Sequence, residues 1–182
     1  MLVVFFGAND SVTPGNIQHI PLQEYKDNLS SILTNPKLKQ HNSTCRVIAV
    51  TPAPINEHDL DQPNHNAELT QRYAATAKSV AAECGVPCVD LWSAFMDHCG
   101  WKAGLPLPGS GSQPRNAKLA ELLTTGGVHF TLLGYSLLYQ GISDSIAAHA
   151  PELLPRNMRV PFPPWDLKPA REIIEDDIFP PS

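Results

Sequence analysis

Short apolar runs alternate with longer amphipathic stretches along this chain of 182 residues. The apolar runs are rich in aliphatic and aromatic side chains, which is typical of strands buried on both faces of a sheet. They lie at 2–6, 46–51 and 87–91. Apolar residues at helical spacing predict helices over 21–34, 67–84, 119–123 and 132–148, with a short helix around 92–96. This alternation predicts an α/β sandwich with a parallel sheet.

Polar and proline-rich segments separate these elements and set the expected domain boundary. Residues 56–66 are mostly polar and residues 100–114 are rich in Gly, Pro and Ser, so both are expected to be surface loops. Many of the 18 prolines lie near the end of the chain. We therefore expect one domain over 1–150 and a Pro-rich, extended C-terminal tail over 151–182.

Composition and charge exclude several classes of function. The chain is 42% hydrophobic, has a formal net charge of −5 and carries no basic stripe, so nucleic acid is not an expected partner. No apolar run reaches the ~20 residues that a membrane helix needs. The apolar start of the chain lacks the basic region of a signal peptide, so a cytoplasmic location is expected. The 4 cysteines have no zinc-binding spacing and are expected to be free thiols.

Two motifs carry candidate chemistry. The first, Gly7-Ala8-Asn9-Asp10, follows the first predicted strand, and ligands of open α/β sheets bind at the carboxyl ends of strands. An Asn amide there can stabilise the oxyanion of an acyl-transfer reaction. The second places His129 in a Gly-rich loop before the last helix, where an imidazole can act as a general base. Taken singly, each motif is more often an ordinary turn or surface histidine.

A metal site in the polar segment 56–66 is a further reading of the sequence. His58, Asp59 and His65 are metal-binding residue types, but their spacing is irregular. A solvated loop is therefore favoured over a metal site.

Together and in this order, the two motifs resemble those of the SGNH/GDSL hydrolase family. Gly7–Asp10 is similar to the block with the family's oxyanion Asn, and Val128–Tyr135 is similar to the block with its catalytic His. Further stretches resemble the isoamyl-acetate-hydrolysing esterase branch, especially its fungal members. These are Phe5–Ser11, Pro21–Tyr25, Thr51–Pro54, Val89–Trp92 and Pro161–Trp165. The resemblance extends from Leu2 to about Asp166.

The resemblance implies a fold, a reaction class and a set of site residues. The fold would be a flavodoxin-like three-layer sandwich with a parallel sheet in strand order 2-1-3-4-5. The activity would be that of a serine ester hydrolase acting on small esters or other acyl compounds, without a cofactor or a metal. Asn9 and Gly7 would line the oxyanion hole, and His129 would be the general base.

The sequence departs from the family pattern at both of the other catalytic positions. No Gly-Asp-Ser block is present, so the chain contains no family nucleophile. Ser11 follows the Asn block rather than a nucleophile turn, and Ser110 and Ser112 have no motif around them. The family's acid lies three residues before the His, where this chain has Gly126.

The acid position is not replaced elsewhere in the chain. Asp90 and Asp144 do not have the right spacing to serve instead. Disabling the triad acid of a serine protease lowers the turnover number about 10⁴-fold. We therefore expect this chain to be inactive as an esterase, and an Asp at position 126 to rescue nothing by itself.

The resemblance also makes residues 2–6 the third strand of the family's sheet, with the first two strands missing. The missing first strand would pair with it, so the Leu2–Phe6 strand is expected to be an exposed apolar edge open to self-association. Two explanations are open: a fragment or truncated gene model of an esterase, or a pseudoenzyme that serves as a binding or assembly protein on the same fold.

Overall fold

A parallel sheet forms the centre of the molecule in the computed structural model, which describes residues 1–41 and 44–158. Its strands are β1 (Leu2–Phe5), β2 (Val47–Val50) and β3 (Cys88–Val89), in the order β1-β2-β3. Leu2 pairs with Val47, and Ala49 pairs with Cys88. The prediction of a parallel α/β sheet is confirmed, and this order is the one expected for neighbouring strands 3, 4 and 5 of the family's sheet.

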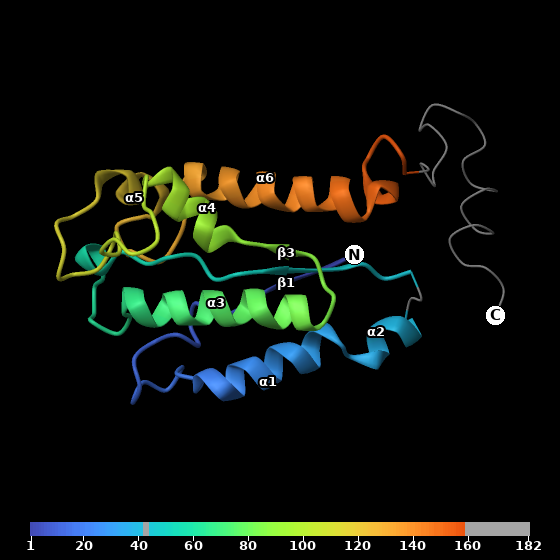
Figure 1. Ribbon diagram of the computed structural model, residues 1–182, viewed down its shortest axis with the longest axis horizontal. Helices are drawn as coiled ribbons and strands as arrows, with labels where there is room; N and C mark the ends of the chain where they lie inside the picture. The colour runs from blue at the N-terminus through green and yellow to red at the C-terminus, as the bar shows by residue number, and fades with distance from the viewer. Residues whose placement is uncertain (42–43, 159–182) are drawn as a thin grey trace, which may run out of the picture.

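Helices cover both faces of the sheet and make a three-layer arrangement (Figure 1). The helices α1 and α3 lie on one face, and α4 and α6 lie on the other, with α5 packed against α4 and α6. The bounds are α1 Leu22–Leu33, α2 Pro36–His41, α3 Ala67–Glu83, α4 Leu91–His98, α5 Ala117–Leu122 and α6 Leu132–His149, with 3-10 turns at η1 Glu57–Asp59 and η2 Pro151–Leu153.

The side chains of the sheet alternate between two cores. Val4 and Ala49 pack with the buried residues of α1 and α3. Ile48 and Val50, their neighbours on β2, pack with residues of α4 and α5 and with the partly buried face of α6. Because successive strand residues point to opposite faces, β2 is buried on both sides, as its continuous apolar run predicts.

β1 differs from the expectation of a strand buried on both faces. Only Val4 is fully buried on this strand, while Phe5 is 36% exposed and Phe6, just beyond it, is 56% exposed. The physical reason is that β1 is a terminal strand of the described sheet, so one side of it has no neighbouring strand. The separate expectation that this strand forms an apolar edge agrees with the structure.

Three further details depart from the sequence expectations. Residues 36–41 form a short helix that was not predicted. β3 is shorter than the predicted strand. The segment 56–66 is not wholly a surface loop, because it contains η1 and because Asn56 is 0% exposed. The predicted tail lies mainly in 159–182, outside the described residues, so the boundary at residue 150 stays a prediction.

The carboxyl ends of the strands gather the long connecting loops at one end of the molecule. In Figure 1 this is the left end, where the segments after β1 and β2 and the segment before α6 come together. No helix in the described part of the chain is long and apolar enough to cross a bilayer.

Candidate functional site

A cavity of about 350 Å³ lies at this end of the sheet and brings together residues from three segments. Asn9 comes from the turn after β1, and Gly126, Val128 and His129 come from the loop before α6. The third segment follows η1 and contributes Leu60, Asp61, Gln62, Asn64 and His65. The structure therefore places Asn9 around the same cavity as Gly126 and His129, although Asn9 is more than a hundred residues from both in the chain.

The turn after β1 presents the Asn9 side chain and holds it through backbone contacts. The Ser11 amide donates to the Gly7 carbonyl over 3.0 Å, and the Val12 amide donates to the Asn9 carbonyl over 3.2 Å. Asn9 is exposed, and its side chain bonds to no other residue in the described ranges. Its amide group is therefore available to a ligand in the cavity.

Gly7 lies beneath this turn rather than in the cavity lining. Its φ of 119° is in the region that favours glycine. A Cβ there would lie 2.8 Å from the Tyr25 hydroxyl and 3.0 Å from Pro52 Cγ. Its amide donates to Asp10 Oδ2 over 3.1 Å. The structure thus gives Gly7 a role in forming the turn, and its role as an oxyanion donor stays a prediction.

The His129 loop, defined here as residues 123–130, is a tight turn that enters α6. The Thr124 amide donates to the His129 carbonyl over 2.8 Å, and Leu123 forms an antiparallel bridge with Phe130. At its tip Gly127 has a φ of 69°. The His129 side chain is exposed, and it forms no hydrogen bond or ion pair with any residue that the structure describes.

The position of the family's acid is occupied here by Gly126, which carries no carboxylate and has open space beside it. Gly126 lines the cavity, and a Cβ added to it would meet no atom within 4 Å. Asp61 is the one carboxylate among the residues lining the cavity. Asp144 bonds Gln140 on α6, and Asp90 caps α4, so neither of them is at the cavity.

Among the described residues that line the cavity, none is a serine, threonine or cysteine. Ser11 is 0% exposed and its hydroxyl bonds the Ala8 carbonyl and Thr70 Oγ1, so it belongs to the core. Ser110 and Ser112 bond each other over 3.0 Å in the loop before α5. The structure therefore places none of these three serines in the cavity lining, and the expectation that none of them replaces the family nucleophile stays a prediction.

Two further cavity residues come from the polar segment: Asn64, which the sequence analysis does not identify, and His65, which it considers only for a metal site. His65 Nδ1 lies 2.8 Å from Asn64 Oδ1, while its Nε2 is buried without a partner. Burial lowers the pKa of His65, against the opposing effect of the Ala8 carbonyl. Val12 and His65 form an antiparallel bridge, so this segment also supports the Asn9 turn.

The residues considered for a metal site do not converge. Asp59 bonds Asn56 and pairs with Arg115, whereas His65 lines the cavity. Across residues 1–41 and 44–158 no group of three His, Cys, Asp or Glu side chains is placed to hold a metal ion.

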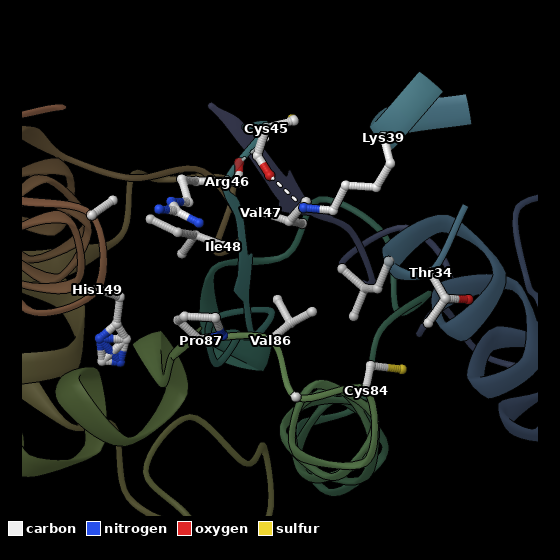
Figure 2. Close-up of a pocket in the computed structure, with 13 residues that line it drawn as sticks. Thr34, Lys39, Cys45, Arg46, Val47, Ile48, Cys84, Val86, Pro87 and His149 are labelled. Carbon is white, nitrogen blue, oxygen red and sulfur yellow. Dashed lines mark hydrogen bonds between the residues drawn. The ribbon is translucent and has the colours of Figure 1, made fainter. Parts of the chain in front are cut away.

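A second cavity, of about 370 Å³, lies at the opposite end of the sheet, beside the amino ends of β2 and β3. Figure 2 shows Lys39, Arg46 and His149 around it, with the Lys39 ammonium donating to the Cys45 carbonyl. It contains none of the predicted site residues. Because ligands of parallel α/β sheets bind at the carboxyl ends of strands, the cavity with Asn9 and His129 is the better candidate site.

Comparison with known proteins gives a consistent picture. Residues 1–137 match the model of the GDSL-like Lipase/Acylhydrolase family. The chain is 32% identical over 145 residues to a GDSL esterase/lipase of Arabidopsis thaliana, covering 70% of this chain and 59% of the relative. It is 31% identical over 169 residues to the isoamyl acetate-hydrolyzing esterase of Schizosaccharomyces pombe, covering 91% of this chain and 57% of the relative.

Solved structures show the same fold. A lipase/acylhydrolase from Enterococcus faecalis superposes with a TM-score of 0.56 at 24% identity, over 80% of this chain and 60% of that one. An acetylxylan esterase from Geobacillus stearothermophilus gives a TM-score of 0.54 at 20% identity, over 79% of this chain and 57% of that one. The chain spans about half to three fifths of the length of these proteins.

Proposed function

We propose, from the premise that the chain belongs to the GDSL-like lipase/acylhydrolase family, that the cavity between Asn9 and His129 binds the acyl group of a small ester or carboxylic acid. The observation that carries this proposal is the convergence of Asn9 and His129 on one cavity at the carboxyl ends of the strands. An amide N–H beside an imidazole suits a carbonyl or carboxylate oxygen, which accepts hydrogen bonds. The names of the relatives, all esterases or lipases, support the same class of ligand.

We further propose that the chain as given binds such compounds without hydrolysing them. In a serine hydrolase the imidazole removes the proton of a serine hydroxyl, and a carboxylate orients the imidazole. Here no hydroxyl or thiol side chain lines the cavity, and Gly126 replaces the carboxylate. The His129 imidazole consequently has no side-chain nucleophile in the cavity lining to activate. The cytoplasmic location of the protein stays a prediction.

Binding can be measured with propionate, a small carboxylate, by following the amide resonances of the cavity residues during titration. We expect saturable shifts at Asn9 and in the His129 loop. Asn9→Ala should weaken binding about two- to tenfold, because it removes one hydrogen bond. Asn28→Ala, which changes an asparagine outside this cavity, is the matched control and should bind like the unaltered chain. Absence of any saturable shift at the cavity would contradict the proposal.

A second candidate function is assembly through β1, with a second copy of the chain as the occupant. The Leu2 amide donates to the carbonyl of Arg46, the residue just before β2, so the alternate amides of Val3 and Phe5 point to the open side of the strand. Phe6 is 56% exposed beside this edge. Unpaired backbone groups with an apolar border favour the addition of another strand.

A further inference from the structure

The His129 loop is fastened to the rest of the molecule at its tip. The amide of Asn56 donates to the carbonyl of Gly127 over 2.9 Å. The carbonyl oxygen of Asn56 also lies close to the Cα of Gly127, because a Cβ added to Gly127 would lie only 2.4 Å from that oxygen. The position of Asn56 therefore sets the position of the loop that carries His129.

Asn56 is held by a short chain of side-chain contacts. It is 0% exposed, and its Nδ2 donates to Asp59 Oδ2 over 2.6 Å. Its Oδ1 is buried without a partner, so within the described part of the chain the contact with Asp59 is the one side-chain hydrogen bond that orients this amide. The other carboxylate oxygen of Asp59 lies 2.6 Å from Arg115 Nη2. The Asp59 side chain is 11% exposed and that of Arg115 is 57% exposed.

This chain of contacts lies between two of the segments that line the cavity. Leu60 and Asp61 follow Asp59 directly, while Gly126 and Val128 flank Gly127. Arg115 itself does not line the cavity. The contacts that connect Arg115 to the cavity lining run through Asp59, Asn56 and Gly127.

We propose that Asp59 and Arg115 are positioning residues, which act through Asn56 to hold the His129 loop in its ligand-binding position. We call Asn56, Asp59 and Arg115 the loop anchor. Its effect on ligand affinity rests on the proposed function of the cavity, whereas its effect on the loop does not. Because the carboxylate of Asp59 is mostly shielded from water, the Arg115 guanidinium that pairs with it is not interchangeable with a neutral side chain.

The test compares Arg115→Gln and Arg115→Lys with Lys118→Gln. Lys118 is an exposed cation on α5 that forms no hydrogen bond or ion pair with the described residues, which makes it a matched control. Hydrogen exchange of the Asn56 amide, which bonds Gly127, reports loop anchoring without any ligand. Propionate titration reports the consequence for binding.

We expect Arg115→Gln to speed exchange at Asn56 and to weaken propionate binding, each about two- to fivefold, the range for a partly exposed ion pair. Exchange at Val80, buried in α3, should not change. Arg115→Lys should keep most of the slow exchange at Asn56 and most of the affinity for propionate. Lys118→Gln should match the unaltered chain in both measurements. Unchanged exchange at Asn56 in Arg115→Gln would overturn the loop anchor. If the unaltered chain binds no propionate, the proposed function fails while the exchange data still decide the anchor.

Discussion

Two adjacent glycines in the His129 loop differ in what a side chain would meet. Gly127 has a φ of 69°, and a Cβ there would lie 2.4 Å from the Asn56 carbonyl oxygen. Gly126 has open space around it. Gly127→Ala should lower the free energy of unfolding by about 1–2 kcal/mol or more, since an L-residue is strained in this conformation. Gly126→Ala should stay within about 0.5 kcal/mol of the unaltered chain. Equal urea denaturation midpoints for the two variants would contradict this account.

Gly126 also permits a direct test of the missing acid. The open space there can receive a carboxylate, so Gly126→Asp should fold with little change in stability. We expect it to hydrolyse p-nitrophenyl acetate no faster than the unaltered chain, because a carboxylate beside the imidazole supplies no nucleophile. A rise in rate that is lost again in Gly126→Asp combined with His129→Ala would show that the His129 imidazole can act as a catalyst in this chain and would contradict this expectation.

At the residue scale, sequence motifs identified the two groups that meet at the cavity but not the groups that support them. Asn9 and His129 lie in recognisable motifs at element ends. Asn56 and His65 lie in a polar segment, which by itself indicates solvent exposure. Their burial arises from contacts with Gly127 and with the turn at Val12, which are distant in sequence and leave no local pattern.

At the element scale, the start of α4 gives a pH-dependent contribution to stability. Asp90 caps this helix by accepting from the Ser93 amide, and it pairs with Lys78 over 2.6 Å. Burial raises the pKa of Asp90, but hydrogen bonds from Lys78 and Ser93 outweigh it and the pKa is lowered. A lowered folded-state pKa stabilises the fold above the ordinary pKa of Asp, about 3.9, and this contribution is lost as pH falls through the folded value.

Asp90→Asn keeps a side-chain oxygen for the cap but removes the charge that Lys78 pairs with. We expect the variant to be less stable than the unaltered chain at pH 7, and the difference to shrink as pH is lowered from about 5 towards 2. Urea denaturation at several pH values measures this. A difference that stays constant over the range would show that the charge of Asp90 is not the cause.

The long elements were predictable because their apolar residues repeat with a clear period. The helices α3 and α6 agree with their predicted bounds within about two residues, the usual uncertainty of helix ends. The apolar pattern does not predict the short helix α2. A proline usually ends a helix, but it is also tolerated at the first position of a new one, as Pro36 is here. β3 is only two residues long because its pairing with β2 is limited to Ala49 and Val50.

At the scale of the whole molecule, the open edge of β1 predicts association between copies of the chain. We expect concentration-dependent self-association in sedimentation velocity. Phe6→Lys should reduce it, because a charge beside an edge strand opposes pairing. Ile17→Lys is the matched control, since Ile17 is 98% exposed but, unlike Phe6, does not adjoin β1 in the chain. A chain that is monomeric at all concentrations, or that responds equally to both changes, would contradict association through β1.

The arrangement of layers was predictable from the alternation of strands and helices, while the state of the cavity was not. The resemblance pointed to Asn9, His129 and Gly126, and the structure brings all three to one cavity. That the lining holds no hydroxyl or thiol depends on where distant segments meet. Ser11 shows this most clearly, because it is two residues from Asn9 yet fully buried in the core.

The most direct test of the central claim, a family cavity without a nucleophile, is labelling of the 182-residue chain with a serine-directed fluorophosphonate. The product is read by intact mass and peptide mapping, after circular dichroism has shown that the protein is folded. The account predicts no adduct. A stoichiometric adduct on a single serine would show that the chain does contain an activated nucleophile and would contradict it.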